Sequence, residues 1–130
     1  MGIMIEKKNI LLGLNAGKGD FHLEDLVHEV QCFCLGLRLE HWKTTSYELH
    51  KAVEMTQASL EDALDSLVEA AVGCANGARP EFDEELKACT DENYLIGYLK
   101  NITTRETDLL NIRDEMLAAL HKFKYLKTLK

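Results

Sequence analysis

The sequence is poor in proline and glycine and contains no long apolar run. One proline and eight glycines occur among 130 residues, which argues against a turn-rich β-sandwich and favours helices. No stretch of about 18 apolar residues is present, so we expect no membrane-spanning segment. Charged residues at Glu6, Lys7 and Lys8 interrupt the N-terminal region, and we therefore expect no secretory signal peptide and a cytoplasmic location.

Basic charge is also scarce. The chain has 22 Asp and Glu against 15 Lys and Arg, a net charge of −7. Tight binding to nucleic acid irrespective of its sequence requires a net basic surface, so we expect no strong DNA binding.

Motifs for a nucleotide or a structural zinc ion are missing. The segment from Gly13 to Gly19 is glycine-rich, but Gly19 stands where a phosphate-binding loop needs Ser or Thr for the metal. The four cysteines form no Cys-x-x-Cys pair, which favours reduced, buried thiols over a zinc site; they are Cys32, Cys34, Cys74 and Cys89.

The length and composition are those of one globular domain. A chain of 130 residues fits a single domain. Apolar residues make up 46% and charged residues 28%, which is typical of a folded protein rather than a disordered one. We divide the chain into an N-terminal arm, residues 1–19, and a helical domain, residues 20–130.

Apolar residues recur every three or four positions in four segments, which predicts four amphipathic helices. We expect them over residues 20–42, 45–72, 91–105 and 108–126, with N-caps at Asp20, Thr45 and Thr107. Residues 73–89 contain the only proline and should form a long loop with at most a short helix. The predicted fold is an all-α four-helix bundle with a long connection between its second and third helices. The inward positions are expected to be Leu23, Leu26, Val27, Val30, Phe33, Cys34 and Leu37; Val53, Leu60, Leu64, Leu67 and Ala71; Tyr94, Leu95, Tyr98, Leu99 and Ile102; and Leu109, Ile112, Met116, Leu120 and Phe123.

Histidines and acids lie in unusual places on the first two helices. His41 falls within the apolar arc of the first helix, where its ring nitrogens need partners. The second helix carries a stripe within an arc of roughly 100°, and no Lys or Arg occurs between residues 52 and 72 to compensate it. Uncompensated carboxylates with imidazoles are the ligands of hard or borderline cations. The stripe, which we call the acidic stripe, consists of His50, Glu54, Glu61, Asp65 and Glu69.

The spacing of the acidic stripe predicts a site shared between two chains. Glu54 and Asp65 are about 16 Å apart along one helix and cannot bind the same ion. They are related by a midpoint next to Ser59, and the same midpoint relates His50 to Glu69. An antiparallel crossing of two copies about a twofold axis would therefore bring each pair together. We expect at least a dimer, with two equivalent metal sites at its interface.

These residues resemble the ferroxidase signature of the Dps proteins, the ferritin-like miniferritins. That signature is a His-Trp pair, a second His, an acid four residues later, and then an Asp and a Glu four residues apart. The spacing between the two histidines is shorter here, and Glu54 stands where that family has Asp. The matching residues are His41-Trp42, His50, Glu54, Asp65 and Glu69.

Small ferritin-like proteins encoded by bacteriophages resemble the chain more closely. They have a similar His-Trp-x-Thr-x-Ser-Tyr turn and a Tyr-Leu-x-Thr-Leu-Lys tail, here residues 41–47 and 125–130. A phage origin would place the protein in the host cytoplasm.

The resemblance implies a ferritin-like bundle that binds iron at a di-iron-type site between subunits. It implies oxidation of Fe(II) by oxygen or peroxide, iron storage or detoxification, and assembly into a hollow cage. The implied metal ligands are His41, His50, Glu54, Asp65 and Glu69, with Glu61 and Asp62 nearby for iron traffic. The alternative is a non-catalytic ferritin-like dimer, or a phage accessory or structural protein, that binds zinc or no metal.

Overall fold

A computed structural model describes residues 22–129, and within this range the chain is all-helical with four helices and no strands. The predicted arm and the expected cap at Asp20 lie outside the described residues, as does Lys130. No helix in the described range has the length and hydrophobicity needed to cross a membrane. The helices are α2 (Leu23–Lys43), α3 (Tyr47–Cys74), α4 (Glu92–Lys100) and α5 (Thr107–Lys127).

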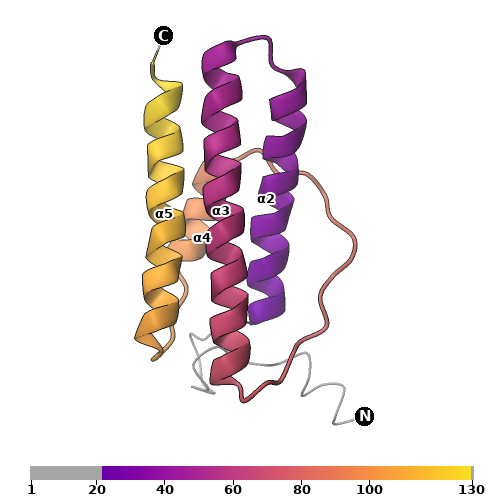
Figure 1. Ribbon diagram of the computed structural model, residues 1–130, viewed down its shortest axis with the longest axis vertical. Helices are drawn as coiled ribbons and strands as arrows, with labels where there is room; N and C mark the ends of the chain where they lie inside the picture. Colours follow the sequence, from indigo (N-terminus) through magenta and orange to yellow (C-terminus); the bar gives the residue numbers. More distant parts are fainter. Residues whose placement is uncertain (1–21, 130) are drawn as a thin grey trace.

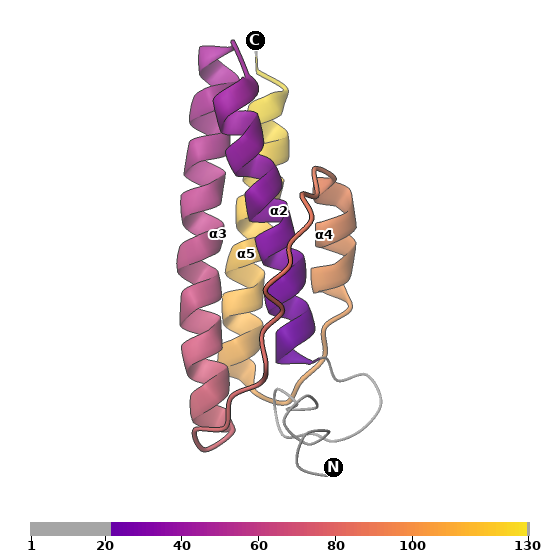
Figure 2. The ribbon, with the colours of Figure 1, turned by 90° about the vertical axis from the view of Figure 1, so that its right-hand side faces the viewer.

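Three long helices lie side by side, and one short helix covers part of their flank (Figures 1 and 2). α3 is antiparallel to α2 and packs against both α2 and α5 (Figure 1). After α3, residues 75–91 contain no helix and run back along the bundle beside α2 to the start of α4 (Figure 2). α4 and α5 then form a second antiparallel pair. The turn between α2 and α3 and the end of α5 therefore lie at the same end of the molecule.

The long helix α3 begins and ends at residues with distinct local signals. The Ser46 hydroxyl accepts a hydrogen bond of 3.2 Å from the Leu49 amide, so Ser46 is the N-cap. The expected cap at Thr45 is wrong by one residue. The expected end at Gly73 is also too early, because α3 continues to Cys74. The left-handed backbone that follows the helix lies at Asn76 and Gly77, where φ is 56° and 89°.

α4 is shorter than the predicted helix over residues 91–105. Asp91 caps it by accepting hydrogen bonds from the Asn93 and Tyr94 amides. At its end, the Arg113 guanidinium donates to the carbonyls of Leu99 and Ile102, at 3.1 and 3.3 Å. A side chain from α5 thus satisfies carbonyls that a longer helix would have satisfied itself.

Two further expectations near α4 and α5 are wrong. Tyr94 was predicted to face inward but is 52% exposed, and Ile96 is buried instead. Thr107 is the first residue of α5, and Glu106 occupies the N-cap position.

The core consists of the apolar stripes predicted for α2 and α3, together with residues of α4 and α5. Every predicted inward residue of α2 and α3 is buried, while Tyr98 and Ile112 are only partly buried. Each fully buried large side chain contributes roughly 1.5–3 kcal/mol of transfer free energy. The side chains with almost no exposure are Leu23, Leu26, Val30, Phe33, Leu60, Leu67, Leu95, Leu99, Leu109, Met116 and Leu120.

Candidate metal centre

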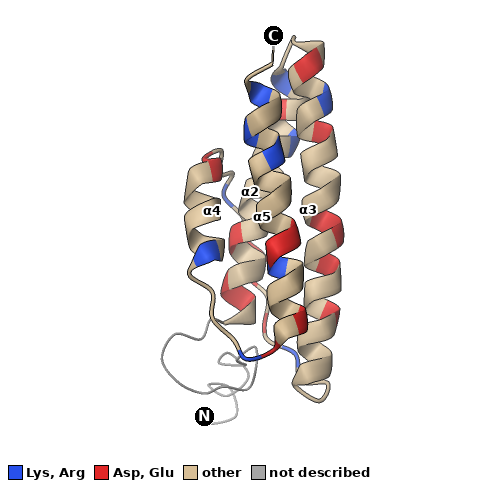
Figure 3. Cartoon of the chain, turned by 90° about the vertical axis from the view of Figure 1, so that its left-hand side faces the viewer, with Lys and Arg blue, Asp and Glu red and all other residues tan. Residues whose placement is uncertain are grey.

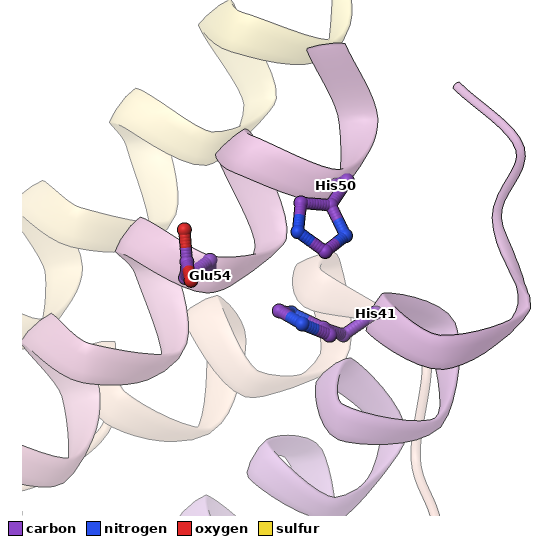
Figure 4. Close-up of side chains that lie close together, drawn as sticks. All are labelled: His41, His50 and Glu54. Atoms are coloured by element: carbon purple, nitrogen blue, oxygen red, sulfur yellow. The ribbon is translucent and has the colours of Figure 1, made fainter. Parts of the chain in front are cut away.

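Three of the five predicted ligands lie together at the turn between α2 and α3. His41 comes from the last turn of α2, and His50 and Glu54 come from the first two turns of α3 (Figure 4). The imidazole rings of His41 and His50 have centroids 4.1 Å apart and are tilted by 46°. One ligand atom from each of the three side chains lies within 4.8 Å of the others.

Local structure explains this grouping. Only residues 44–46 separate α2 from α3, so the last turn of one helix lies beside the first turns of the other. His50 and Glu54 are four residues apart and therefore share a face of α3. Tyr47 stacks on the His50 ring with centroids 6.4 Å apart and an angle of 17°. The position of His50 is thus defined by contacts on two sides.

The group is partly open to solvent and carries a lysine as well as its acid. His41 and His50 are half-buried, whereas Glu54 is exposed. Lys51 Nζ lies 3.1 Å from Glu54 Oε1. The hydrogen bond and charge of Lys51 lower the pKa of Glu54, and His50 and His41 add smaller effects in the same direction. The carboxylate is therefore ionised, but a cation must displace Lys51 to bind it.

Asp65 and Glu69 do not join the group within one chain. Both are exposed, and they lie further along α3 on the same helix face. Among residues 22–129, neither makes a hydrogen bond or an ion pair. Asp65 lines a groove of about 520 Å³ between α2, α3 and the loop residues Phe82 and Leu86.

Two acids of the acidic stripe have basic partners, although the sequence of the second helix predicted none. Arg38 of α2 lies 3.4 Å from Glu61 Oε2, and Gln57 also donates to that oxygen, at 3.1 Å. Arg38 belongs to α2, so the charges along the second helix alone do not include it. Lys51, one residue before the span without Lys or Arg, also reaches Glu54.

Two imidazoles and one carboxylate form a donor set suited to a borderline transition metal. Zinc and non-haem iron both accept this combination, and three protein ligands leave coordination positions open. Ligand atoms around one such ion lie within about 4 Å of one another. The separations of at most 4.8 Å between His41, His50 and Glu54 therefore need only small side-chain rotations.

A second group of ligand-type side chains lies at the opposite end of α3. Ligand atoms of Cys74, Glu106 and Asp108 also fall within 4.8 Å of one another, and Cys74 Sγ is 3.6 Å from Glu106 Oε2. Burial raises the pKa of Cys74, and the carboxylates of Asp108 and Glu106 raise it further. A raised pKa disfavours the thiolate that binds metals, so this group suits a cation less well. No sequence pattern indicated it, because its members come from α3 and from the start of α5.

No protein-family model, curated protein or solved structure matches the chain.

Proposed function

We propose that the chain is a miniferritin-like protein that binds Fe(II) as a substrate between two copies and promotes its oxidation by oxygen or peroxide. His41, His50 and Glu54 of one copy and Asp65 and Glu69 of another would form each site. The observation that carries the proposal is the grouping of His41, His50 and Glu54 at the turn between α2 and α3.

The protein's contribution is binding and orientation. The imidazoles of His41 and His50 donate neutral nitrogen ligands, and the carboxylates balance the charge of the cation. Iron supplies the electron that the oxidant takes. Of the two acids assigned to iron traffic, Asp62 is exposed further along α3 and would attract cations toward the site, whereas Glu61 is already paired with Arg38.

Features of α3 support a site shared between copies. Ala58 is exposed on the face of the acidic stripe near its midpoint, and a small side chain there allows two helices to approach closely, whereas Ser59 lines a groove beside α5. Met55 is also exposed, by 45%, and would be covered in such a contact. Asp65 and Glu69 lack partners within the described part of the chain, which leaves their carboxylates available to a second copy.

The chain path also supports the ferritin-like part of the proposal. The run of residues 75–91 along the bundle makes α4 follow the same direction as α3 (Figure 2). Ferritin-like bundles use one such crossover connection between two antiparallel helix pairs.

The second candidate is a non-catalytic ferritin-like dimer, or a phage accessory or structural protein, that binds zinc or no metal. The ion pair between Lys51 and Glu54 favours it, because Glu54 already has a cationic partner without a metal.

Metal-dependent thermal unfolding under anaerobic conditions tests the proposal. Fe(II) bound only by the folded protein should raise the unfolding temperature of the wild type. At an Fe(II) concentration a hundred times the dissociation constant, the free energy of unfolding should increase by about 2.7 kcal/mol. His50→Gln, Asp65→Asn and Glu69→Gln should each remove most of this shift. Glu84→Gln, which alters an exposed acid of residues 75–91, is the matched control and should retain it. Admission of oxygen should then oxidise Fe(II) in the wild type and the control only.

The variants distinguish the possible failures. If His50→Gln alone removes the shift, the ion binds within one chain and the shared site is wrong. If Zn(II) shifts the midpoint and Fe(II) is not oxidised, the non-catalytic candidate replaces the proposed function. An equal shift in all variants, or none in the wild type, contradicts the site.

A further inference from the structure

Cys32 is buried by the loop that returns along α2 rather than by the main core. It is 6% exposed, yet it lies outside the main cluster of buried apolar side chains. The Cys89 amide donates a hydrogen bond of 3.0 Å to the Cys32 carbonyl. One turn further along α2, a Cβ at Gly36 would overlap the carbonyl oxygen of Cys89. The loop backbone is therefore in direct contact with α2 at this point.

This contact brings the backbones of two free cysteines to a separation suited to a disulfide. With standard bond lengths, a direct amide–carbonyl hydrogen bond leaves the two α-carbons roughly 6 Å apart. Disulfides join α-carbons between about 4.4 and 6.8 Å apart. Both cysteines are free, and Cys89 is half-buried while Cys32 is buried. Both thiols also contribute to the raised pKa of Tyr94, after the larger effects of Glu29 and of burial, so both lie near the same phenol.

Cys32 has a base beside it. Its Sγ lies 3.5 Å from His28 Nε2, one helical turn earlier in α2. On the other side of the ring, His28 Nδ1 lies 3.3 Å from Asp83 Oδ2, an ion-pair distance without the alignment of a good hydrogen bond. Asp83 belongs to the same returning loop as Cys89. An imidazole with a carboxylate behind it accepts a proton from a thiol and stabilises the resulting charge.

We propose that Cys32 and Cys89 form a redox-active pair that hydrogen peroxide converts into a disulfide, with His28 as the base for Cys32. The more exposed Cys89 thiolate attacks peroxide, and the O–O bond breaks to give a Cys89 sulfenic acid and hydroxide, which is protonated to water. His28 then takes the proton of the Cys32 thiol. The Cys32 thiolate attacks the Cys89 sulfur, the S–O bond breaks, and His28 returns the proton to the departing hydroxide. Two thiols are oxidised and one peroxide is reduced to two waters.

The disulfide would join the loop covalently to α2. The site is distinct from the group of His41, His50 and Glu54 and requires no metal, so it does not depend on the proposed function. The oxidised form should unfold at a higher temperature than the reduced form, because the link restricts the unfolded chain.

The test treats the reduced full-length protein with hydrogen peroxide in the presence of a chelator, which excludes iron-driven oxidation. Intact mass should fall by two hydrogen atoms, and peptide mapping should show a link between Cys32 and Cys89. Cys34→Ala, which keeps this core position apolar, should form the same link as the wild type. In Cys32→Ser, the sulfenic acid at Cys89 should persist and be captured by dimedone.

A His28→Gln variant separates the role of the base from that of proximity. It should form the sulfenic acid at the wild-type rate but close the disulfide about tenfold more slowly, since less thiolate is available. An unchanged closure rate overturns the role of His28. Retention of all four thiols, a link through Cys34 or Cys74, or links only between chains overturns the assignment of the pair.

Discussion

Cys32 and Cys34 are two residues apart in α2 but have different surroundings. Cys34 belongs to the main core. Its pKa is raised to about 12, chiefly by burial and to a smaller extent by Glu61, with Arg38 partly offsetting both. Cys32 instead faces His28 and the returning loop. Two buried thiols of one helix thus differ in chemistry because a helix turns by about 100° per residue.

The buried Cys34 should be inert toward alkylation. A pKa of about 12 leaves roughly one thiol in ten thousand ionised at pH 8, and only the thiolate reacts. Iodoacetamide at that pH should modify Cys89 in the folded protein long before Cys34, as measured by peptide mass spectrometry. Unfolded protein, in which all four cysteines should react, is the control. Equal rates for Cys34 and Cys89 in the folded state would contradict this description of the core.

At the scale of the elements, residues 75–91 approach α2 so closely that only a glycine fits at the point of contact. Gly36 is buried, and the absence of a side chain there lets the Cys89 backbone lie against the helix. The loop is thereby held against α2 without secondary structure of its own.

Gly36→Ala should destabilise the protein by about 1–3 kcal/mol, because the new methyl group must displace backbone rather than a mobile side chain. Urea unfolding would measure the loss. Gly97→Ala in α4 is the matched control, because nothing lies within 4 Å of a Cβ there. That change should be neutral or stabilise by up to about 1 kcal/mol, since alanine favours a helix more than glycine does. Similar losses in both variants would show that the contact at Cys89 is not tight.

In the whole molecule, the negative charge is unevenly distributed. Lys and Arg gather near the end that carries the C-terminus, whereas acids predominate along the remainder of α3 (Figure 3). The basic end includes Lys43, Lys124 and Lys127, in the last turns of α2 and α5. Two copies that cross antiparallel along α3 would place the acidic half of one beside the basic end of the other. Charge complementarity therefore agrees with the twofold arrangement proposed above.

The oligomeric state can be tested at the predicted crossing point. Light scattering of the wild type at micromolar concentration should give at least a dimer. Ala58→Arg introduces a long charged side chain at an exposed position of α3 on the face of the acidic stripe, and it should yield monomers without lowering the unfolding midpoint of the monomer. Glu84→Arg, on the loop, should remain associated. A monomeric wild type would contradict the site shared between two copies.

Much of the fold was predictable because helix periodicity is a local property. The stripes of α2 and α3 are buried as expected, since any packing of these helices must cover Leu26, Val30, Leu60 and Leu67. The grouping of His41 with His50 was also accessible, because a short turn between antiparallel helices makes distant rings neighbours. Helix ends were less predictable. Thr45 and Ser46 are both residue types that cap helices, so the sequence does not distinguish them. The end of α4 depends on Arg113 from another helix.

The sequence by itself determined the helical class, the core faces and the acidic stripe, because each depends on residues a few positions apart. Tertiary structure alone decided which side chains from distant segments meet. Arg38 reaches Glu61 across two helices, and Asp83 and Cys89 reach α2 only because the loop returns along it. The contacts of Asp83 and Cys89 depend on the path of residues 75–91, which no periodicity encodes. The path is instead set by where the chain can pack closely, as it does against Gly36.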